Sequence, residues 1–383
     1  MKKKKWLTIL LAAVMVFTLI PTAAFAAGED ATVSTGEELS AAFEKGGTII
    51  LGNDITYKDT LVLKADTVLD LNGHTLTHEF VRGESKYVYA IYTDEQYLYD
   101  FTLRDSSQDG TGKIISNQYA IYGSYDELSI EGGTISGQYT TAPNCSKFTM
   151  SGGVVDDMRL RVNGNAELSG GTSHKLEISV NAVDGQADSG KLLVHGNFAS
   201  EGSAVLSAEN GVTLSGNAKF NDGITIKSAA VIEDKVSIVV SNEDGYYSRK
   251  INFGGSGNVT INGGYFEAAD RHFLYCDGDN GRTKQFVING GTFYLKSSEN
   301  WTYGLFYNCT PVINGGVFKT DGDEIKFGNS WNAAEIKFNG GYFEKPLGKS
   351  NEGDNHIPNF QYPSNYSFSS DTLGSLTGDT GEY

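Results

Sequence analysis

Carboxylate and guanidinium side chains gather in one short stretch of the sequence and form the best catalytic candidate. Asp156 and Asp157 stand just before Arg159 and Arg161. Two arginines two positions apart share one face of a β-strand, because successive side chains of a strand point to opposite faces. A polysaccharide lyase needs such a combination, in which a base removes a sugar proton and cations neutralise the neighbouring carboxylate. A solvent-exposed patch of ion pairs is the simpler interpretation of the same residues.

Aromatic residues form a second candidate set, and the chemistry that they suggest is sugar binding. The apolar face of a pyranose ring can stack on an aromatic side chain whose polar tip stays in water. The candidates are Tyr87, Tyr89, Trp301, Tyr303 and Trp331. If the strand alternates regularly, Tyr87 and Tyr89 share one side and Tyr92 falls on the other, so part of this set is expected in the core.

Metal-binding patterns are incomplete in this sequence. His74 and His78 would share a strand face about 13 Å apart, which is too far for one zinc ion. The stretch Asp-Gly-Asp-Asn-Gly at 277–281 resembles the start of a calcium loop, but it lacks the third acidic position and the closing glutamate. The stretch Asp-Gly-Asp-Glu at 321–324 is comparable. We therefore expect no cofactor and no metal site, and calcium is the one ion left open.

A recurring phrase, Ile-Asn-Gly-Gly-x-Phe, indicates which elements must position these residues. It begins at Ile261, Ile288 and Ile313, and a fourth copy begins with Phe338; its first glycine advances by 27, 25 and 25 residues. Looser copies upstream are spaced by 18 and 20 residues. The apolar residues around the phrase alternate as in a strand, and helical periodicity is absent between residues 48 and 345. Short strands at this period predict the coils of a parallel β-helix.

Each residue of the phrase has an expected role in such a coil. The isoleucine and the phenylalanine point inward and stack on their counterparts in neighbouring coils. The Gly-Gly pair supplies positive φ at a corner between two strands. The asparagine hydrogen-bonds to its equivalents one coil away, as asparagines do in stacked cross-β structures. The predicted structural ladder consists of Asn262, Asn289, Asn314 and Asn339.

The repeats divide residues 27–383 into three segments. Residues 46–345 are the predicted β-helix, and at about 25 residues per coil they would form about 12 coils. Residues 27–45 are the predicted N-terminal cap with a short helix. Residues 346–383 are rich in Ser, Asn, Gly and Asp and are expected to be a polar tail, with a partial cap at 360–368.

The predicted cap helix has both a start signal and an apolar face. Thr35 and Glu38 form a capping box, in which the two side chains accept hydrogen bonds from the first backbone N–H groups. Leu39, Ala42 and Phe43 then lie on one side of the helix. We expect this side to cover the first coil, because open strand edges invite pairing with other chains.

The first 26 residues have the three parts of a secretion signal. Four lysines at positions 2–5 precede an apolar run at 7–20, and Ala24 and Ala26 are the small residues of a cleavage site. The apolar run is shorter than the about 20 residues that span a membrane. We therefore expect cleavage near Ala26, a secreted or cell-surface product, and no membrane contact after cleavage.

The chain is acidic, with 47 acidic residues against 30 basic ones and a net charge of −17. Loss of the four lysines of the first 26 residues would bring the charge to −21. Such a charge repels nucleic acid and anionic lipid, so we expect neither as a partner.

The three cysteines are too few for a disulfide framework. Cys276 and Cys309 stand 14 and 6 residues before the next Gly-Gly, so stacking would not bring them together. We therefore expect no bridge, and Cys145 is the third cysteine.

Two stretches carry a family resemblance. Gly-Thr-Ile-Ile-Leu-Gly-Asn-Asp-Ile at 47–55 and Val-Leu-Asp-Leu-Asn-Gly-His-Thr-Leu-Thr at 68–77 resemble the opening coils of pectate-lyase-like right-handed β-helix proteins. The resemblance is greatest to the repetitive secreted and cell-surface type found in Gram-positive bacteria. The repeated phrase and the stretch at 212–217 resemble the later coils, so that the resemblance covers nearly all of residues 30–345. It implies an all-β, single-stranded right-handed parallel β-helix.

Related folds include polysaccharide lyases and hydrolases, but their signatures are largely missing here. Of the motifs of polygalacturonase-like enzymes only Asp156-Asp157 is present, and the Trp-Ile-Asp-His motif of pectate lyases is absent. The matching motifs are scaffold residues, so the resemblance is specific for architecture and not for activity.

Three functions remain open. We favour a non-catalytic secreted or cell-surface monomer that acts in adhesion or extracellular glycan binding, with a glycan or a host or cell-wall surface as its partner. The alternative is a polysaccharide lyase or glycoside hydrolase that acts on an extracellular, uronate-containing glycan. The third is a structural stalk of a larger surface protein, which the repetition suggests.

Overall fold

The computed structural model describes residues 30–79, 88–94, 96–139, 142–240, 251–255, 257–268, 272–276, 285–296, 304–307, 311–322, 325–327, 335–344, 347–349, 359–361, 367–368 and 376–377. The predicted secretion signal lies outside this part of the chain. Within it, no helix has the length and apolarity needed to cross a membrane.

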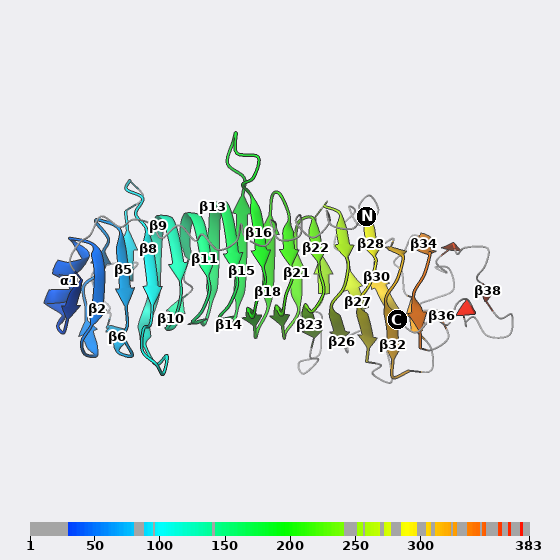
Figure 1. Ribbon diagram of the computed structural model, residues 1–383, viewed down its shortest axis with the longest axis horizontal. Coiled ribbons are helices and arrows are strands. Elements are labelled where there is room, and N and C mark those ends of the chain that lie inside the picture. Colours follow the sequence, from blue (N-terminus) through cyan, green and yellow to red (C-terminus); the bar gives the residue numbers. More distant parts are fainter. Residues whose placement is uncertain are drawn as a thin grey trace, which may run out of the picture.

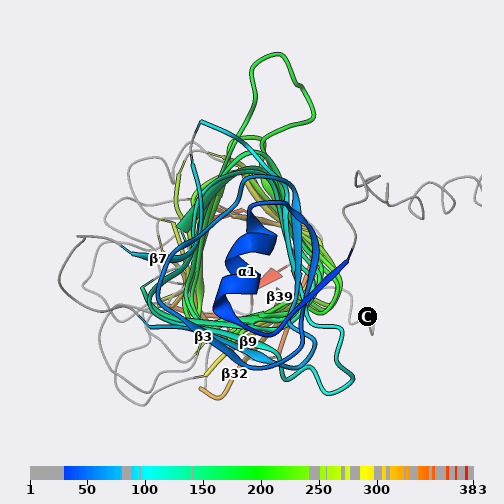
Figure 2. The ribbon, with the colours of Figure 1, turned by 90° about the vertical axis from the view of Figure 1, so that its left-hand side faces the viewer.

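The chain winds into a β-helix in which almost every strand pairs in parallel with the strand one coil before and one coil after it (Figure 1). Seen from the end, the coils superimpose around a common interior (Figure 2). The predicted all-β parallel β-helix is therefore confirmed. Its strands form three walls, which we call A, B and C in the order in which the chain visits them.

Wall A contains the strands that lead into the glycine corners. They are β1 (Ala31–Val33), β2 (Gly47–Leu51), β5 (Thr67–Asp70), β8 (Phe101–Arg104), the ends of β9 (Lys113–Ile130), β11 (Ala142–Met150) and β13 (Met158–Leu168), then β16 (Lys191–Val194), β19 (Val212–Leu214), β22 (Ala230–Ile232), β25 (Val259–Ile261), β28 (Phe286–Ile288), β31 (Pro311–Ile313), β34 (Glu335–Phe338) and β37 (Asn359–Gln361).

Wall B contains the strands that follow the corners. They are β3 (Ile55–Tyr57), β6 (Thr75–His78), the start of β9, β10 (Thr134–Tyr139), β12 (Val154–Val155), β14 (Thr172–Ser173), β17 (Ala199–Ser200), β20 (Lys219–Phe220), β23 (Ser237–Val240), β26 (Tyr265–Ala268), β29 (Thr292–Leu295), β32 (Val317–Thr320) and β35 (Tyr342–Phe343).

Wall C closes each coil. Its strands are β4 (Leu61–Val62), β7 (Tyr89–Thr93), the middle of β9, the first parts of β11 and β13, β15 (Leu176–Asn181), β18 (Ala204–Ala208), β21 (Ile224–Ile226), β24 (Ile251–Phe253), β27 (His272–Tyr275) and β30 (Gly304–Tyr307). Two short pairs complete the described strands: β33 (Ile325–Phe327) with β36 (Leu347–Lys349), and β38 (Ser367–Phe368) with β39 (Leu376–Thr377).

The interior is filled by columns of like residues from successive coils. The phenylalanines of the repeated phrase stack with nearly parallel rings, 4.8 Å between the centroids of Phe266 and Phe293, 4.9 Å between Phe293 and Phe318, and 4.9 Å between Phe318 and Phe343. The first three of these rings are fully buried, and Phe343 at the end of the column is partly buried. The inward direction and the stacking expected for this residue are thus confirmed.

The two glycines of each phrase differ in their backbone conformation. Only the second has positive φ, for example 104° at Gly291 and 107° at Gly316. The first lies against the coil below: a Cβ atom at Gly290 would stand 2.5 Å from the carbonyl oxygen of Asn262. The expectation of positive φ therefore holds for one glycine, and close approach of neighbouring coils requires the other.

A helix covers the first coil at the end where the chain enters the solenoid (Figures 1 and 2). Helix α1 (Gly36–Phe43) begins at the N-cap Thr35, whose side chain accepts the N–H of Glu38, and its buried residues are Leu39, Ala42 and Phe43. The carboxylate of Glu38 accepts the N–H of Ser34 at 2.8 Å, one residue before the position of a standard capping box.

Strand pairing continues beyond residue 345, where the sequence suggested a tail. Strand β37 pairs with β34 through Glu335 and Asn359, and β36 pairs with β33. Wall A holds thirteen strands from β2 to β34, close to the twelve coils expected.

The expectation that no cysteine is bridged is wrong. Cys276 is disulfide-bonded, whereas Cys145 is free and buried; Cys309 lies outside the described residues. The error came from counting backward from the next Gly-Gly, since the intervening loops differ in length. The strand register is the correct guide: Tyr275, just before Cys276, pairs with Tyr307.

Candidate functional site

The predicted catalytic cluster is a set of contacts between adjacent coils. Arg159 and Arg161 both point outward from β13, as their spacing indicated. The guanidinium of Arg159 lies 3.6 Å from the carboxylate of Glu177, and the ammonium of Lys175 lies 3.7 Å from that of Asp157. Arg159 and Lys175 therefore already have acidic partners one coil away, whereas Arg161 has no ion pair within the described residues.

Asp156 is the centre of a second set of contacts in the same region. One carboxylate oxygen lies 3.0 Å from Nδ1 of His174, and the other accepts a hydrogen bond from the hydroxyl of Ser136. The order is serine, aspartate, histidine, whereas nucleophile activation requires the histidine to lie between the other two. His174 is separated from Asp156 by one coil in sequence, so only the coil register could have revealed the contact.

Four tyrosines form the most extensive aromatic cluster on the outside of the described walls. They come from two adjacent strands of wall C, β7 and β9, and each is half-buried. We call this set the tyrosine patch: Tyr89, Tyr92, Tyr119 and Tyr122. The rings of Tyr89 and Tyr122 are 4.3 Å apart and 10° from parallel, and those of Tyr89 and Tyr92 are 5.3 Å apart and 16° from parallel. The ring of Tyr119 is tilted by 50° to that of Tyr89 at 5.7 Å.

An irregularity of β7 brings Tyr92 to the same side as Tyr89, so the expected alternation is wrong at this point. Two consecutive residues between them, Ala90 and Ile91, are both fully buried. The paired segment of β9 has the same feature, since Tyr119 and Tyr122 flank two consecutive buried residues. Each of the two strands therefore directs both of its tyrosines outward, whereas regular alternation would direct one of them inward.

The turn after β7 exposes two large apolar side chains of the same coil. Tyr97 and Leu98 are 56% and 51% exposed, which is unusual for side chains of this size. The ring of Tyr97 stacks on that of Tyr99 at 6.3 Å and 16°. The side chain of Thr93, the last residue of β7, donates a hydrogen bond to the carbonyl oxygen of Tyr97, so the turn is tied to the strand that carries the tyrosine patch.

Carboxylates lie next to this turn. Asp126 donates its N–H to the carbonyl oxygen of Tyr99 at 3.1 Å. Asp100 donates its N–H to the carboxylate of Asp66, and its own carboxylate accepts the N–H of Glu127, both at 3.0 Å. The acidic residues of three successive coils thus follow one corner of the solenoid. We call Asp66, Asp100 and Asp126 the acidic corner.

The electrostatics of Asp100 reflect this crowding. Its partial burial raises the pKa of the carboxyl, because the charged form loses hydration. The hydrogen bond from the N–H of Glu127 acts in the opposite direction, while repulsion from Asp66, Asp126 and Glu127 raises the pKa further.

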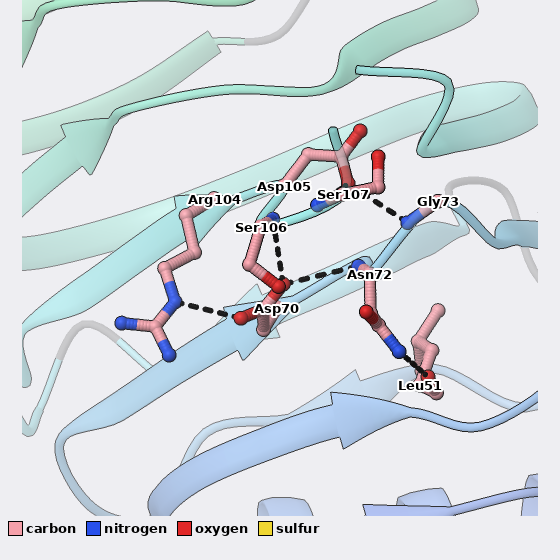
Figure 3. Close-up of polar contacts among 8 residues, drawn as sticks. All are labelled: Leu51, Asp70, Asn72, Gly73, Arg104, Asp105, Ser106 and Ser107. Atoms are coloured by element: carbon pink, nitrogen blue, oxygen red, sulfur yellow. Dashed lines mark hydrogen bonds and ion pairs between the residues drawn. The ribbon is translucent and has the colours of Figure 1, made fainter. Parts of the chain in front are cut away.

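The Asp-Leu-Asn-Gly stretch that carries the family resemblance forms a structural corner (Figure 3). The carboxylate of Asp70 is 2% exposed and lies 2.9 Å from Nε of Arg104. It also accepts the N–H groups of Asn72 and Ser106, both at 3.0 Å, and the Asn72 amide donates to the carbonyl oxygen of Leu51. These bonds connect consecutive coils and occupy both oxygens of Asp70, which indicates a structural role.

The four asparagines of the repeated phrase lie directly above one another on the surface. Each side-chain amide donates to the side-chain oxygen of the asparagine one coil before it, at 2.9 Å from Asn289 to Asn262, 2.8 Å from Asn314 to Asn289 and 2.7 Å from Asn339 to Asn314. The amide of Asn262 continues the series by donating to Glu233. The series is internally satisfied and serves to hold the coils in register.

The remaining candidates do not form a site within the described residues. Tyr87, Trp301, Tyr303 and Trp331 lie outside them, as does the 277–281 stretch. Nδ1 of His74 lies 3.5 Å from the carboxylate of Asp54, whereas His78 is buried with Nδ1 at 3.4 Å from the hydroxyl of Ser116. The described part of the chain contains no cluster of three or more His, Cys, Asp or Glu residues able to hold a metal ion.

Comparison with known proteins gives this chain no relative: no protein-family model, no curated protein and no solved structure matches it. The contacts described above are therefore the basis for its functional interpretation.

Proposed function

We propose that this chain is a secreted or cell-surface glycan-binding protein without catalytic activity, and that the tyrosine patch is its binding surface. The observation that carries the proposal is the stack of half-buried tyrosines on the outside of β7 and β9. Buried rings are ordinary core residues, but partly exposed rings in a fixed array offer apolar surface to a ligand.

The rigidity of the patch supports this assignment. Its rings are held by parallel strand pairing, with Tyr89 opposite Tyr119 and Tyr92 opposite Tyr122. A surface that is ordered before binding loses less conformational entropy when a ligand arrives. Adjacent coils lie about 4.8 Å apart. Tyrosine rings from two coils can therefore contact one sugar ring at more than one of its edges.

A lyase or hydrolase has weaker support. Three of the four candidate residues already have partners one coil away: Asp156 contacts His174, Asp157 contacts Lys175 and Arg159 contacts Glu177. Within the described residues, Arg161 has no ion pair. Substrate neutralisation by Arg159 or Lys175 would first require their ion pairs to break, and Arg161 alone gives a lyase little support. A pure stalk is also less well supported, because a stalk has no need for the exposed side chains of Tyr97 and Leu98.

A glycan array probed with the chain lacking residues 1–26 tests the proposal. We expect binding to at least one oligosaccharide and loss of most of that binding, about tenfold or more in Kd, in a Tyr89→Ala, Tyr122→Ala double variant. Tyr342→Ala is the matched control, because Tyr342 is 48% exposed on wall B. Circular dichroism checks that each variant is folded.

Two outcomes would contradict the proposal. A blank array with a folded chain would remove glycan binding, and equal binding by the double variant would remove the tyrosine patch. Ultraviolet absorbance of the same oligosaccharides after incubation tests for unsaturated uronates, and their appearance would favour the lyase alternative.

A further inference from the structure

We infer that His78 is a pH-sensitive positioning residue: while it is neutral the tyrosine patch keeps its stacked arrangement, and its protonation on acidification loosens the patch. This inference rests on the proposed function and adds a means of regulation to it. It follows from a column of buried polar side chains behind the two strands that carry the patch.

The column comes from three successive coils of wall B. Tyr57 of β3 is opposed to His78 of β6, and His78 is opposed to Ser116 of β9. All three side chains are buried, and His78 is only 1% exposed. The rings of Tyr57 and His78 are 5.0 Å apart, and Nδ1 of His78 lies 3.4 Å from the hydroxyl of Ser116. Polar groups at such a depth need hydrogen-bond partners inside the protein.

Both ends of the column find these partners in the backbone of the tyrosine patch. The hydroxyl of Tyr57 donates to the carbonyl oxygen of Ala90 at 3.0 Å, and Ala90 directly follows Tyr89. The hydroxyl of Ser116 donates to the carbonyl oxygen of Tyr119 at 3.3 Å. The column is therefore hydrogen-bonded to both strands of the patch, β7 and β9.

The irregularity of these two strands explains why interior donors are needed. A strand with two consecutive buried residues departs from the regular pleat, and its backbone groups then need partners outside the regular ladder. A third interior hydroxyl acts in the same way, since that of Tyr125 donates to the carbonyl oxygen of Tyr122 at 3.1 Å. The directions of the patch rings therefore depend on buried donors behind them.

The hydrogen bonds of Ser116 determine which nitrogen of His78 carries its proton. The single hydroxyl proton of Ser116 goes to the carbonyl oxygen of Tyr119, while the hydroxyl oxygen accepts the N–H of Gln118 at 3.2 Å. The remaining lone pair can accept a proton from Nδ1 of His78, so Nδ1 carries the hydrogen of the neutral ring. An added proton must then bind at Nε2 and would place a full charge in the interior, which is costly.

The surroundings of His78 favour its neutral form. Burial lowers the pKa of His78, because the imidazolium loses hydration, and the backbone of Lys58 and the charge of Asp59 only partly oppose this effect. Among the described residues, the other titratable groups next to the ring are Tyr57, whose pKa is raised by burial, and the exposed Glu79.

The sign of the pH effect follows from the lowered pKa. A loosened patch that admits water to His78 would restore the ordinary pKa of about 6.5 and so bind a proton more tightly than the ordered patch. The ordered arrangement is therefore fully favoured above about pH 6.5, and it loses stability as the pH falls from there towards the lower pKa of the ordered state.

Near-ultraviolet circular dichroism of the chain lacking residues 1–26 tests the inference without any ligand, because the signal of packed tyrosines is lost when their packing is lost. The contribution of the patch is the difference between the unsubstituted chain and the Tyr89→Ala, Tyr122→Ala variant. We expect this difference to fall by about half or more between about pH 7.5 and about pH 5, while the far-ultraviolet spectrum stays unchanged.

His78→Gln separates ionisation from packing. Its amide can donate to the hydroxyl of Ser116 but cannot take up a proton, so the patch signal should be retained at both pH values. His174→Gln is the matched control, because His174 is an exposed histidine of the same wall and its variant should lose the signal as the unsubstituted chain does. The glycan array repeated at about pH 5 should likewise lose binding in the unsubstituted chain and keep it in His78→Gln.

Tyr57→Phe tests the column in a second way, because it removes the hydroxyl that holds Ala90 and keeps the ring. The patch signal should already be weaker at about pH 7.5 in this variant. The variant also decides the matter if His78→Gln does not fold, since an unchanged patch signal in folded Tyr57→Phe would overturn the inference.

The outcomes distinguish this inference from the proposed function. A patch signal that does not change with pH in the unsubstituted chain would overturn the role of His78, and so would an equal loss in His78→Gln; neither result affects glycan binding at neutral pH. A blank array at neutral pH together with the expected dichroism would remove the proposed function and leave the positioning role of His78 intact.

Discussion

At the scale of single residues, the column of phenylalanines explains why the repeated phrase keeps an aromatic residue after its glycines. The rings of Phe266, Phe293 and Phe318 are buried and stacked at 4.8–4.9 Å. This spacing matches the distance between neighbouring coils, about 4.8 Å. Each ring therefore fills the space between the ring below and the ring above.

Replacing Phe293 by alanine should lower the free energy of unfolding by about 3–5 kcal/mol, because it leaves a cavity inside a column that is closed on both sides. Urea denaturation followed by circular dichroism measures the change. Lys319→Ala is the control: Lys319 lies on the adjacent coil with an exposed side chain, and its loss should cost no more than about 0.5 kcal/mol. Equal, small losses at both positions would contradict the inward assignment.

Asp105 is the residue whose ionisation should contribute most visibly to stability in the first coils. Its carboxylate accepts the N–H groups of Gly73 at 2.8 Å, Ser107 at 3.2 Å and Gly112 at 2.6 Å. Partial burial raises the pKa of this carboxyl, but the hydrogen bonds from Gly112, Ser107 and Gly73 outweigh that effect. The pKa of Asp105 therefore lies below its ordinary value.

A depressed pKa stabilises the folded state above the ordinary value of about 3.9, and this stabilisation is lost as the pH falls through the lower pKa of the folded state. Asp105→Asn should therefore cost about 2 kcal/mol at pH 7. The difference from the unsubstituted chain should shrink below about pH 4. Thermal unfolding between pH 2.5 and 7 measures it, with Asp109→Asn in the same turn as the exposed control. A difference that is constant over this range would contradict the assigned role.

At the scale of elements, regular spacing explains what the sequence could predict. The asparagine series, the phenylalanine column and the face of α1 all follow from residues that recur at the period of a strand, a coil or a helix. Tyr92 could not be placed in this way, because two consecutive buried residues, Ala90 and Ile91, interrupt the alternation of β7. Only packing of the complete coil decides such an irregularity.

Contacts between coils of unequal length were the other failure of prediction from the sequence. His174 meets Asp156 after 18 residues, and His195 lies 2.7 Å from Glu167 after 28. The length of the loop in each coil sets the number of residues between the two partners. The residues around each partner do not indicate this number. The disulfide of Cys276 was missed for the same reason. The architecture was therefore predictable from the repeats, whereas the partners of individual polar residues were not.

The cap helix should matter more for solubility than its length suggests. Phe43 is fully buried at the end of the solenoid, and α1 packs against the first coil. Phe43→Asp should release the helix and expose the edges of the first strands, which can pair with other chains. Size-exclusion chromatography with light scattering should then show oligomers that the unsubstituted chain lacks. Ser40→Asp on the exposed side of α1 is the control, and a monomeric Phe43→Asp variant would contradict the capping role.

At the scale of the whole molecule, equivalent residues of successive coils lie at a constant distance from one another along the solenoid. Each coil contacts only its neighbours, so a feature shared by two coils becomes a stripe along the rod. The stacked asparagines, the tyrosine patch and the acidic corner are three such stripes on different parts of the surface. The proposed function depends on this geometry, because Tyr89 and Tyr122 belong to different coils.

The register between coils is therefore the central claim, and engineered disulfides test it most directly. Thr260 and Val287 are opposed in adjacent coils, and Val312 lies one coil further along the same column. Adjacent strands are about 4.8 Å apart, within the range of a disulfide, whereas two coils span about 9.6 Å. Mass spectrometry after mild oxidation should find a bridge in Thr260→Cys, Val287→Cys and none in Thr260→Cys, Val312→Cys. Bridging in the second variant and not in the first would contradict the register and the surfaces built on it.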